Sequence, residues 1–246
     1  MMLYRLHFPC TLASMQVTFG RDYSQLSRVF NYAIDFVYLH HKGKVIGNID
    51  WYSERFYQYN NAYNAKLSSL TNNPEPGTVP AQISNLMGSL DCTANAICRP
   101  YENDNAQHAF YNHYHHGHFI IWQAVTFPDG MIVLEGPEPG YFTDIMVWRD
   151  CQLRQQLEAI MQEREEAGLV RLKLYGDKVY NSSALVTAAW SLRHGAVQAW
   201  MVVQNSMMSK LRVSVEWAFE RIIGTNKYAA FSRTLMVQNS YQSTIL

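Results

Sequence analysis

The chain has 246 residues, of which 48% are hydrophobic and 16% are charged, and its basic and acidic side chains balance to a formal net charge of zero. This composition excludes a disordered chain and is typical of a folded protein with a sizeable core. No apolar run approaches the roughly 20 residues of a membrane-spanning helix, so we expect a soluble protein without a membrane partner. The four cysteines form no CxxC pair, which favours a reducing compartment.

The charge is unevenly distributed along the chain. Basic residues are in excess by two in residues 1–80 and by three in residues 205–246, whereas acidic residues are in excess by five in residues 81–204. An acidic centre between basic ends fits a site that gathers metal ions while its margins contact phosphate. An ordinary solvated surface explains the same pattern equally well.

The part of the chain before residue 71 predicts helices. Residues 20–41 place apolar side chains three and four positions apart, which is helical spacing, and Asp22 or Ser24 suits the N-cap. The tyrosine-rich residues 51–70 predict a second helical region. Residues 71–80 contain three prolines and one glycine, and therefore predict a linker.

After the linker the pattern becomes that of strands. Residues 85–91 predict a first strand that ends at Asp91, and residues 118–136 predict a hairpin that turns at 128–130. A fourth strand is expected at residues 169–177.

Two further helices are expected in this part of the chain. One begins with Asp144, takes Thr143 as its N-cap and ends near Gly168, and the other covers residues 206–224. Residues 181–200 fit no clear pattern. Strands that alternate with helices after an antiparallel meander predict an α/β fold, a mixed sheet flanked by helices.

Three acids occupy related places in these elements: Asp91 and Asp177 each end a strand, and Glu216 lies in the last helix. The first and fourth strands can be neighbours, because the hairpin lies on the outer side of the first. Three close carboxylates repel one another unless cations lie between them, and oxygen ligands suit Mg²⁺. Two such ions can support phosphodiester cleavage. On spacing alone, chance placement among twenty acids remains the better explanation.

Four motifs change that balance. The stretch "SLDCTANAICRP" resembles the "DGT...I..P" motif of the Harbinger-type (PIF/Harbinger) transposases, which are DDE superfamily endonucleases. The stretch "HGHFIIWQAVTFPDGMIVLEGPEPGYFTDIMVW" is similar to the family's next block, in which a "PDG" hairpin leads to "GP.PG..HD". "LYGDKVY" resembles "GD.GY", and "LRVSVEWAFERI" resembles "R..VE..F..". The motifs follow the family's order from residue 85 to residue 228.

The resemblance implies an RNase H-like fold and an activity. The chain is then a metal-dependent DNA endonuclease or transposase that hydrolyses phosphodiester bonds by a two-metal DDE mechanism. Asp91, Asp177 and Glu216 are its implied catalytic residues and metal ligands. The implied cofactor is a divalent metal, Mg²⁺ or Mn²⁺, as two ions.

The resemblance also implies a division into domains. The nuclease domain is expected at residues 85–246, after a Pro-rich linker at 71–84. Residues 1–70 resemble the small helical region that precedes the family's catalytic core and fit a helix-turn-helix-like, DNA-binding pattern. The chain stops soon after "GTNKYAAF", so the C-terminal helical segment expected after the Glu216 helix looks shortened or altered.

Two residues are candidates for auxiliary roles. Asp144 matches the "HD" position of the family, but an acid in the first turn of a helix also suits the helix dipole, and we favour that capping role over an auxiliary site role. Arg212 precedes Glu216 by one helical turn and could orient its carboxylate or contact phosphate. An ordinary surface helix pair explains Arg212 about as well.

The sequence departs from the family pattern at several positions. Cys92 and Val179 stand where the family has glycine. Five histidines within residues 108–118 suggest zinc, but no cysteine or carboxylate completes a ligand set at zinc-like spacing, so we expect no zinc there. Histidines in place of lysines or arginines also predict weaker or pH-dependent contact with phosphate.

The expected partner is double-stranded DNA, and the nucleus is the expected location because of that role. The low basic content is consistent with a separate DNA-binding partner protein, and an oligomer is left open. One alternative is a truncated or domesticated transposase derivative that binds DNA or protein without catalysis. Another is an RNA nuclease on the same fold, because two-metal chemistry does not choose between sugars.

Overall fold

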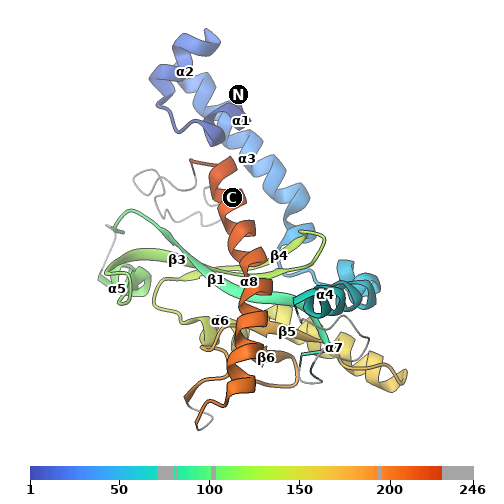
Figure 1. Cartoon of the computed structure of the whole chain (residues 1–246). Helices are drawn as coiled ribbons and strands as arrows, with labels where there is room; N and C mark the ends of the chain where they lie inside the picture. The colour runs from blue at the N-terminus through green and yellow to red at the C-terminus, as the bar shows by residue number, and fades with distance from the viewer. Residues whose placement is uncertain (71–79, 81–82, 101–103, 193–195, 229–246) are drawn as a thin grey trace.

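The computed structural model of the chain describes residues 1–70, 80, 83–100, 104–192 and 196–228 (Figure 1). The strands are β1 (Leu86–Ala96), β2 (Tyr111–Asn112), β3 (Gly117–Thr126), β4 (Ile132–Pro139), β5 (Lys173–Gly176) and β6 (Val186–Ala188). The helices are α1 (Met2–His7), α2 (Leu12–Phe19), α3 (Tyr23–Val45), the 3₁₀ helix η1 (Asp50–Arg55), α4 (Phe56–Leu70), α5 (Asp104–Phe110), α6 (Asp144–Asp150), α7 (Gln152–Glu166) and α8 (Ala199–Thr225). The predicted α/β class is confirmed.

The sheet is mixed, with β1 near its centre. Its order within the described residues is β2-β3-β1-β5-β6. β2 pairs with the first two residues of β3, and β4 pairs with β3 from Ile120 to Thr126. β1 runs antiparallel to β3 and parallel to β5, and β6 is parallel to β5. β3 and β4 form the predicted hairpin. The prediction that the first and fourth strands are neighbours is therefore confirmed.

β1 is longer than the sequence predicts. The expectation that it ends at Asp91 is wrong, because pairing with β3 continues from Asp91, opposite Ala124, to Ala96, opposite Phe119. Asp91 is therefore inside a strand. The pairing of β1 with β5 is irregular between Leu86 and Gly88, where a bulge shifts the register.

The expected single helix from residue 144 to 168 is two helices. Cys151 has extended backbone angles (φ −77°, ψ 151°), so it ends α6 and begins α7. Its sulfur accepts a hydrogen bond from the Arg154 N–H at 3.4 Å and caps α7. Thr143 is the N-cap of α6 by position, but its side chain makes no capping hydrogen bond, which corrects the predicted role.

Two buried clusters hold helices against the sheet. One joins α7, through Leu153, Leu157 and Met161, to β-strand residues such as Val125 and Leu174. The other joins α4 and α8 to the beginning of β1 and to β5. Figure 1 shows α8 running across the sheet, and α8 contacts β1.

The helical region is confirmed as helical, and part of it shares the core of the sheet. Asp22 caps α3 by accepting from the Ser24 N–H at 3.0 Å, as predicted. α1 and α2 lie at the end of the molecule away from the sheet, and α3 runs from that end to β4 (Figure 1). Tyr52, Phe56 and Tyr59 instead pack with β-strand residues. The division into domains at residues 71–84 stays a prediction, since most of that segment lies outside the described residues.

Some features were not predicted at all. α1, α2 and β6 were missed, and α8 begins seven residues before the expected start. The expectation of a shortened C-terminal segment falls on residues 229–246, which lie outside the described residues. Over the part of the chain that is described, no helix combines the length and hydropathy needed to cross a bilayer.

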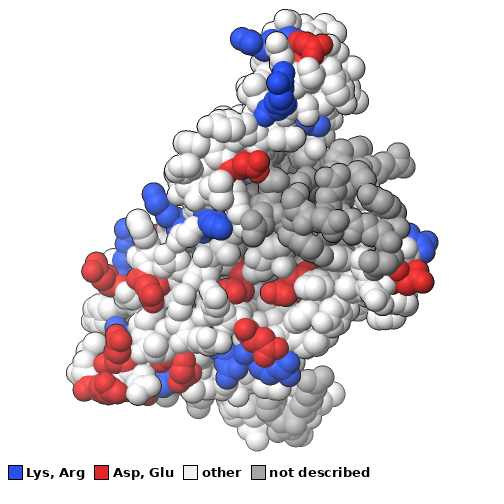
Figure 2. Space-filling model, turned by 180° about the vertical axis from the view of Figure 1, so that it is seen from behind, with Lys and Arg blue, Asp and Glu red and all other residues white. Residues whose placement is uncertain are grey.

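The described surface carries both signs of charge. Figure 2 shows Lys and Arg side chains at the α1–α3 end and a gathering of Asp and Glu side chains at the lower left, where α7 lies. Two of the α7 acids, Glu158 and Glu165, are about half exposed, and Arg171 contacts both of them.

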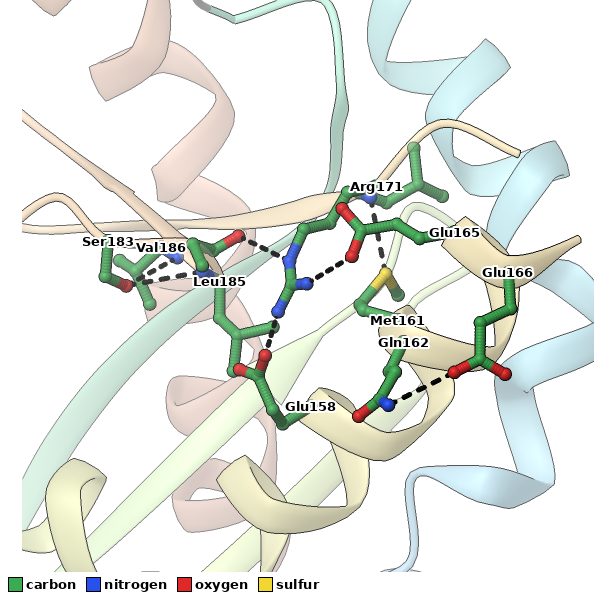
Figure 3. A network of polar contacts seen from close by, with 11 residues as sticks. Glu158, Met161, Gln162, Glu165, Glu166, Arg171, Ser183, Leu185 and Val186 are labelled. Atoms are coloured by element: carbon green, nitrogen blue, oxygen red, sulfur yellow. Dashed lines mark hydrogen bonds and ion pairs between the residues drawn. The ribbon is translucent and has the colours of Figure 1, made fainter. Parts of the chain in front are cut away.

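Arg171 ties α7 to the strand that follows it (Figure 3). Its guanidinium bonds the Glu165 carboxylate at 2.7 Å, contacts Glu158 and donates to the Ala184 carbonyl oxygen at 3.2 Å. The side chain is 18% exposed. One cation therefore fixes the helix, the start of β5 and the approach to β6 relative to one another.

Candidate functional site

Asp91 points toward α8 because of strand alternation. Its neighbour Leu90 belongs to the cluster under α7, so Ser89 and Asp91 face the other side of the sheet. Ser89 is within 2.8 Å of the Tyr63 hydroxyl on α4, and Asp91 contacts Arg212 on α8. The side chain of Asp91 is 15% exposed.

The environment of Asp91 makes its charge costly. Burial raises its pKa to about 6, although the Arg212 charge and the Cys92 N–H, which donates to Oδ1 at 3.0 Å, both act to lower it. The charges of Asp144 and Asp177 raise it further. Three of the predicted acids therefore lie close enough to repel one another.

Arg212 joins two of the predicted site residues. Its Nη1 lies 2.8 Å from Asp91 Oδ2, and its Nη2 lies 2.9 Å from Glu216 Oε1. Arg212 and Glu216 are four residues apart on α8 and so share a helix face. Glu216 is 48% exposed, so it forms the open side of this arrangement. The interpretation of Arg212 as a residue that orients Glu216 is supported by this contact.

Asp177 directly follows β5, as predicted. The Lys178 N–H donates to its Oδ1. The preceding Gly176 is required by packing, because a Cβ there would lie 2.8 Å from Cδ2 of the Tyr180 ring. The charge of Asp177 also acts on Asp144, Asp91 and Arg212, so this acid, at the end of β5, is near residues on both sides of β1.

Asp144 lies on the opposite side of β1 from Arg212, in a cluster with Cys92. Burial raises the pKa of Asp144, and a hydrogen bond from the Cys92 thiol opposes that rise. Cys92 Sγ is 3.4 Å from the Tyr180 hydroxyl, and Gln123 Nε2 donates to that hydroxyl oxygen at 3.0 Å. The side chain that replaces the family's glycine therefore has its own polar partners.

The sequence did not identify Gln123 or Tyr180. Tyr180 is the final residue of the "GD.GY"-like motif, so its place in the motif was a usable signal. Gln123 is fully buried in the middle of an otherwise apolar β3 segment. A polar residue at that position is a signal of a buried partner, because an amide inside a core must be hydrogen-bonded.

A cavity of about 570 Å³ opens beside this second cluster. Two predicted acids, Asp144 and Asp177, line it together with Cys92. His115 and Lys178 add groups that can carry positive charge. Asp91 and Glu216 are not among the lining residues, because they are engaged with Arg212 on the α8 side.

The acids suit a divalent cation by chemistry but are not arranged as a metal site. Carboxylate oxygens are ligands that Mg²⁺ and Mn²⁺ take, and the charges of Asp144 and Asp177 raise the pKa of the nearby Asp91. Over the described residues, however, no three His, Cys, Asp or Glu side chains are gathered to hold a metal. Arg212 lies between Asp91 and Glu216 instead.

Comparison with known proteins identifies the family. The family profile described as a DDE superfamily endonuclease matches residues 90–244. The chain therefore belongs to the DDE superfamily endonucleases, a class of transposase-like nucleases. The matched region contains all of the predicted catalytic and auxiliary residues. No curated protein and no solved structure matched the chain.

Proposed function

We propose that the chain is a DNA endonuclease of the Harbinger type with an RNase H-like nuclease domain. The observation that supports this most is the convergence of its acids on the centre of the sheet. Asp91 on β1 is linked through Arg212 to Glu216 on α8, and Asp177, which follows the parallel neighbour β5, is within reach of the charges of Asp91 and Arg212. A strand order with the hairpin on one side of β1 and two parallel strands on the other also supports an RNase H-like fold.

In this proposal Asp91, Asp177 and Glu216 hold two divalent ions, Mg²⁺ or Mn²⁺. When bound, such ions activate a water and stabilise the leaving oxygen of a phosphodiester. The chain's own residues supply the rest. Burial of Asp91 keeps water from its carboxylate, and Lys178 and His115 at the cavity are placed to contact phosphate.

Double-stranded DNA is the proposed substrate, and the nucleus is the proposed location. The described surface mixes both signs of charge (Figure 2). A separate DNA-binding protein that supplies target recognition fits such a surface, because nonspecific DNA affinity depends on clustered basic residues.

A nicking assay with the Asp177→Asn variant tests the function. We expect the wild-type chain to nick supercoiled DNA with Mn²⁺ and the variant to lose at least about a hundredfold in rate, since one ligand of the ions is neutralised. DNA binding should be unchanged or slightly stronger, because a like charge is removed. Asp150→Asn, an exposed acid paired with Arg149, is the matched control and should nick normally. Equal nicking by Asp177→Asn would remove Asp177 from the site.

The second candidate is a non-catalytic derivative that binds DNA or protein. The contact of Arg212 with both Asp91 and Glu216 favours it, because these oxygens are the ones a metal would need. If the wild-type chain neither nicks DNA nor binds Mn²⁺, with or without DNA, the second candidate replaces the first.

A further inference from the structure

Arg212 makes an internal ion-pair bridge between a strand and a helix. Arg212 Nη1 forms an ion pair with Asp91 at 2.8 Å, and Nη2 forms one with Glu216 at 2.9 Å, so a single cation binds both carboxylates. Arg212 is 27% exposed and Asp91 15% exposed, so both are shielded from much of the screening by water. Such charge-assisted hydrogen bonds are stronger than those between neutral groups.

The bridge competes with any other cation for the same oxygens. A guanidinium stays protonated at all ordinary pH values, so it cannot leave by losing its proton. A divalent ion that binds Asp91 Oδ2 and Glu216 Oε1 must break both ion pairs. Arg212, which is partly buried, then loses both of its carboxylate partners. That loss opposes metal binding unless Arg212 finds another anion.

A phosphate of DNA is an anion that fits. The planar guanidinium fork matches phosphate as well as it matches carboxylate. If Arg212 moves from the carboxylates to a phosphate, its charge stays paired, while Asp91 and Glu216 become free for the metal.

We propose that Arg212 is a built-in competitor of the divalent metal, which holds Asp91 and Glu216 until a DNA phosphate draws it away. This inference rests on the proposed nuclease site and adds its regulation. The metal set then assembles only on DNA, and the DNA-free protein binds metal weakly. In this role Arg212 is a positioning residue for the two carboxylates.

Calorimetric titration of Mn²⁺ into the full-length chain tests the proposal without any cleavage. In the absence of DNA, Arg212→Gln should bind Mn²⁺ at least about tenfold more tightly than wild type, because two charge-assisted contacts no longer compete. Arg212→Lys, which keeps the charge but has no fork, should lie between them. Arg221→Gln removes the same charge from the exposed end of α8 and controls for long-range attraction.

In a second experiment, Ca²⁺, which also binds oxygen ligands, is titrated into the chain in the presence and absence of duplex DNA. The wild-type chain should gain affinity for the cation when DNA is present, whereas Arg212→Gln should gain much less. Wild-type affinity equal to or above that of Arg212→Gln without DNA would overturn the proposal. Circular dichroism melting of each variant separates these outcomes from loss of fold.

Failure of the competitor role and failure of the nuclease site give different results. If wild type and Arg212→Gln bind Mn²⁺ equally and Asp177→Asn abolishes binding, the metal site stands and the competitor role falls. If no variant binds a divalent ion with or without DNA, the proposed metal site falls and takes this inference with it.

Discussion

Glu135 on β4 is a carboxylate whose folded environment disfavours its charge. Its Oε1 accepts a long hydrogen bond, 3.4 Å from the Gln152 N–H, and its Oε2 is buried without a hydrogen-bond partner among the described residues. Burial raises the pKa of Glu135 above its ordinary value of 4.5. The folded state therefore binds this proton more firmly than the unfolded state does.

This environment predicts a pH-dependent effect of Glu135→Gln. Because the pKa is raised in the folded state, wild-type stability is lost as pH rises through and above 4.5, and the glutamine variant escapes that loss. The free energy of unfolding of the variant should gain on that of wild type as pH rises from below 4.5 to well above it. Urea denaturation across this range measures it, with the exposed Glu163→Gln as a control for lost charge. A difference that does not grow with pH contradicts the argument.

At the residue scale, motifs identified the acids but not their contacts. Asp91, Asp177 and Glu216 were found because each lies in a recognisable motif, and the structure brings their charges together. The pairing of Arg212 with Asp91 joins residues 121 positions apart. Sequence spacing carries no information on such a contact, because it depends on how α8 crosses β1.

At the element scale, Arg171 explains how the most acidic helix is held. α7 packs its Leu153, Leu157 and Met161 side chains into the core and places its acids outward, and Arg171, just before β5, reaches two of those acids (Figure 3). The contact with the Ala184 carbonyl oxygen extends the link toward β6. Burial of the hydrophobic face holds α7 on the sheet, and the ion pairs of Arg171 fix how far α7 is shifted along its own axis.

Arg171→Met should destabilise the fold while it keeps the length of the side chain. Loss of the contacts with Glu158, Glu165 and Ala184 is expected to lower the free energy of unfolding by about 1–2 kcal/mol, a value reduced because both glutamates are half exposed. Chemical denaturation measures it. Arg149→Met breaks an exposed pair with its neighbour Asp150 and should leave the denaturation midpoint unchanged. Equal midpoints for Arg171→Met and wild type would show that the network contributes nothing.

Prediction of elements succeeded where a pattern was long and failed where tertiary contacts decided. The periodic residues 20–41 gave α3, and the alternating hairpin gave β3 and β4. β6 has three residues and exists because it pairs with β5. The break at Cys151 interrupts a continuous helical pattern, and the buried sulfur that caps α7 is its physical reason.

At the scale of the whole molecule, the first 70 residues are part of the support of the sheet. η1 and α4 bury Tyr52, Phe56 and Tyr59 against it, and Tyr63 and Leu67 join the cluster under α8. Asn60 Nδ2 also donates to the Ser84 and Leu86 carbonyl oxygens at 2.8 Å. The beginning of β1 is therefore held by α4.

Removal of residues 1–70 should abolish the cooperative fold. Each large side chain that leaves the core costs about 2 kcal/mol, and the five lost from η1 and α4 amount to much of the roughly 5–15 kcal/mol that stabilises a domain. A chain without residues 1–22 loses α1, α2 and the Asp22 cap of α3, and should still fold. Near-ultraviolet circular dichroism with thermal unfolding distinguishes the two. A cooperative transition in the shorter chain would show that the nuclease domain is independent.

The bulge between Leu86 and Gly88 has a consequence for which side chain of β1 meets Arg212. Consecutive side chains of a strand face opposite ways, so the parity of a position decides whether it meets Arg212 or Tyr180. The extra residue at the bulge reverses that parity for everything downstream. Without it, Cys92 would face α8 and Asp91 would be turned toward Tyr180. The bulge, several residues before Asp91, therefore determines whether a carboxylate or a thiol faces Arg212.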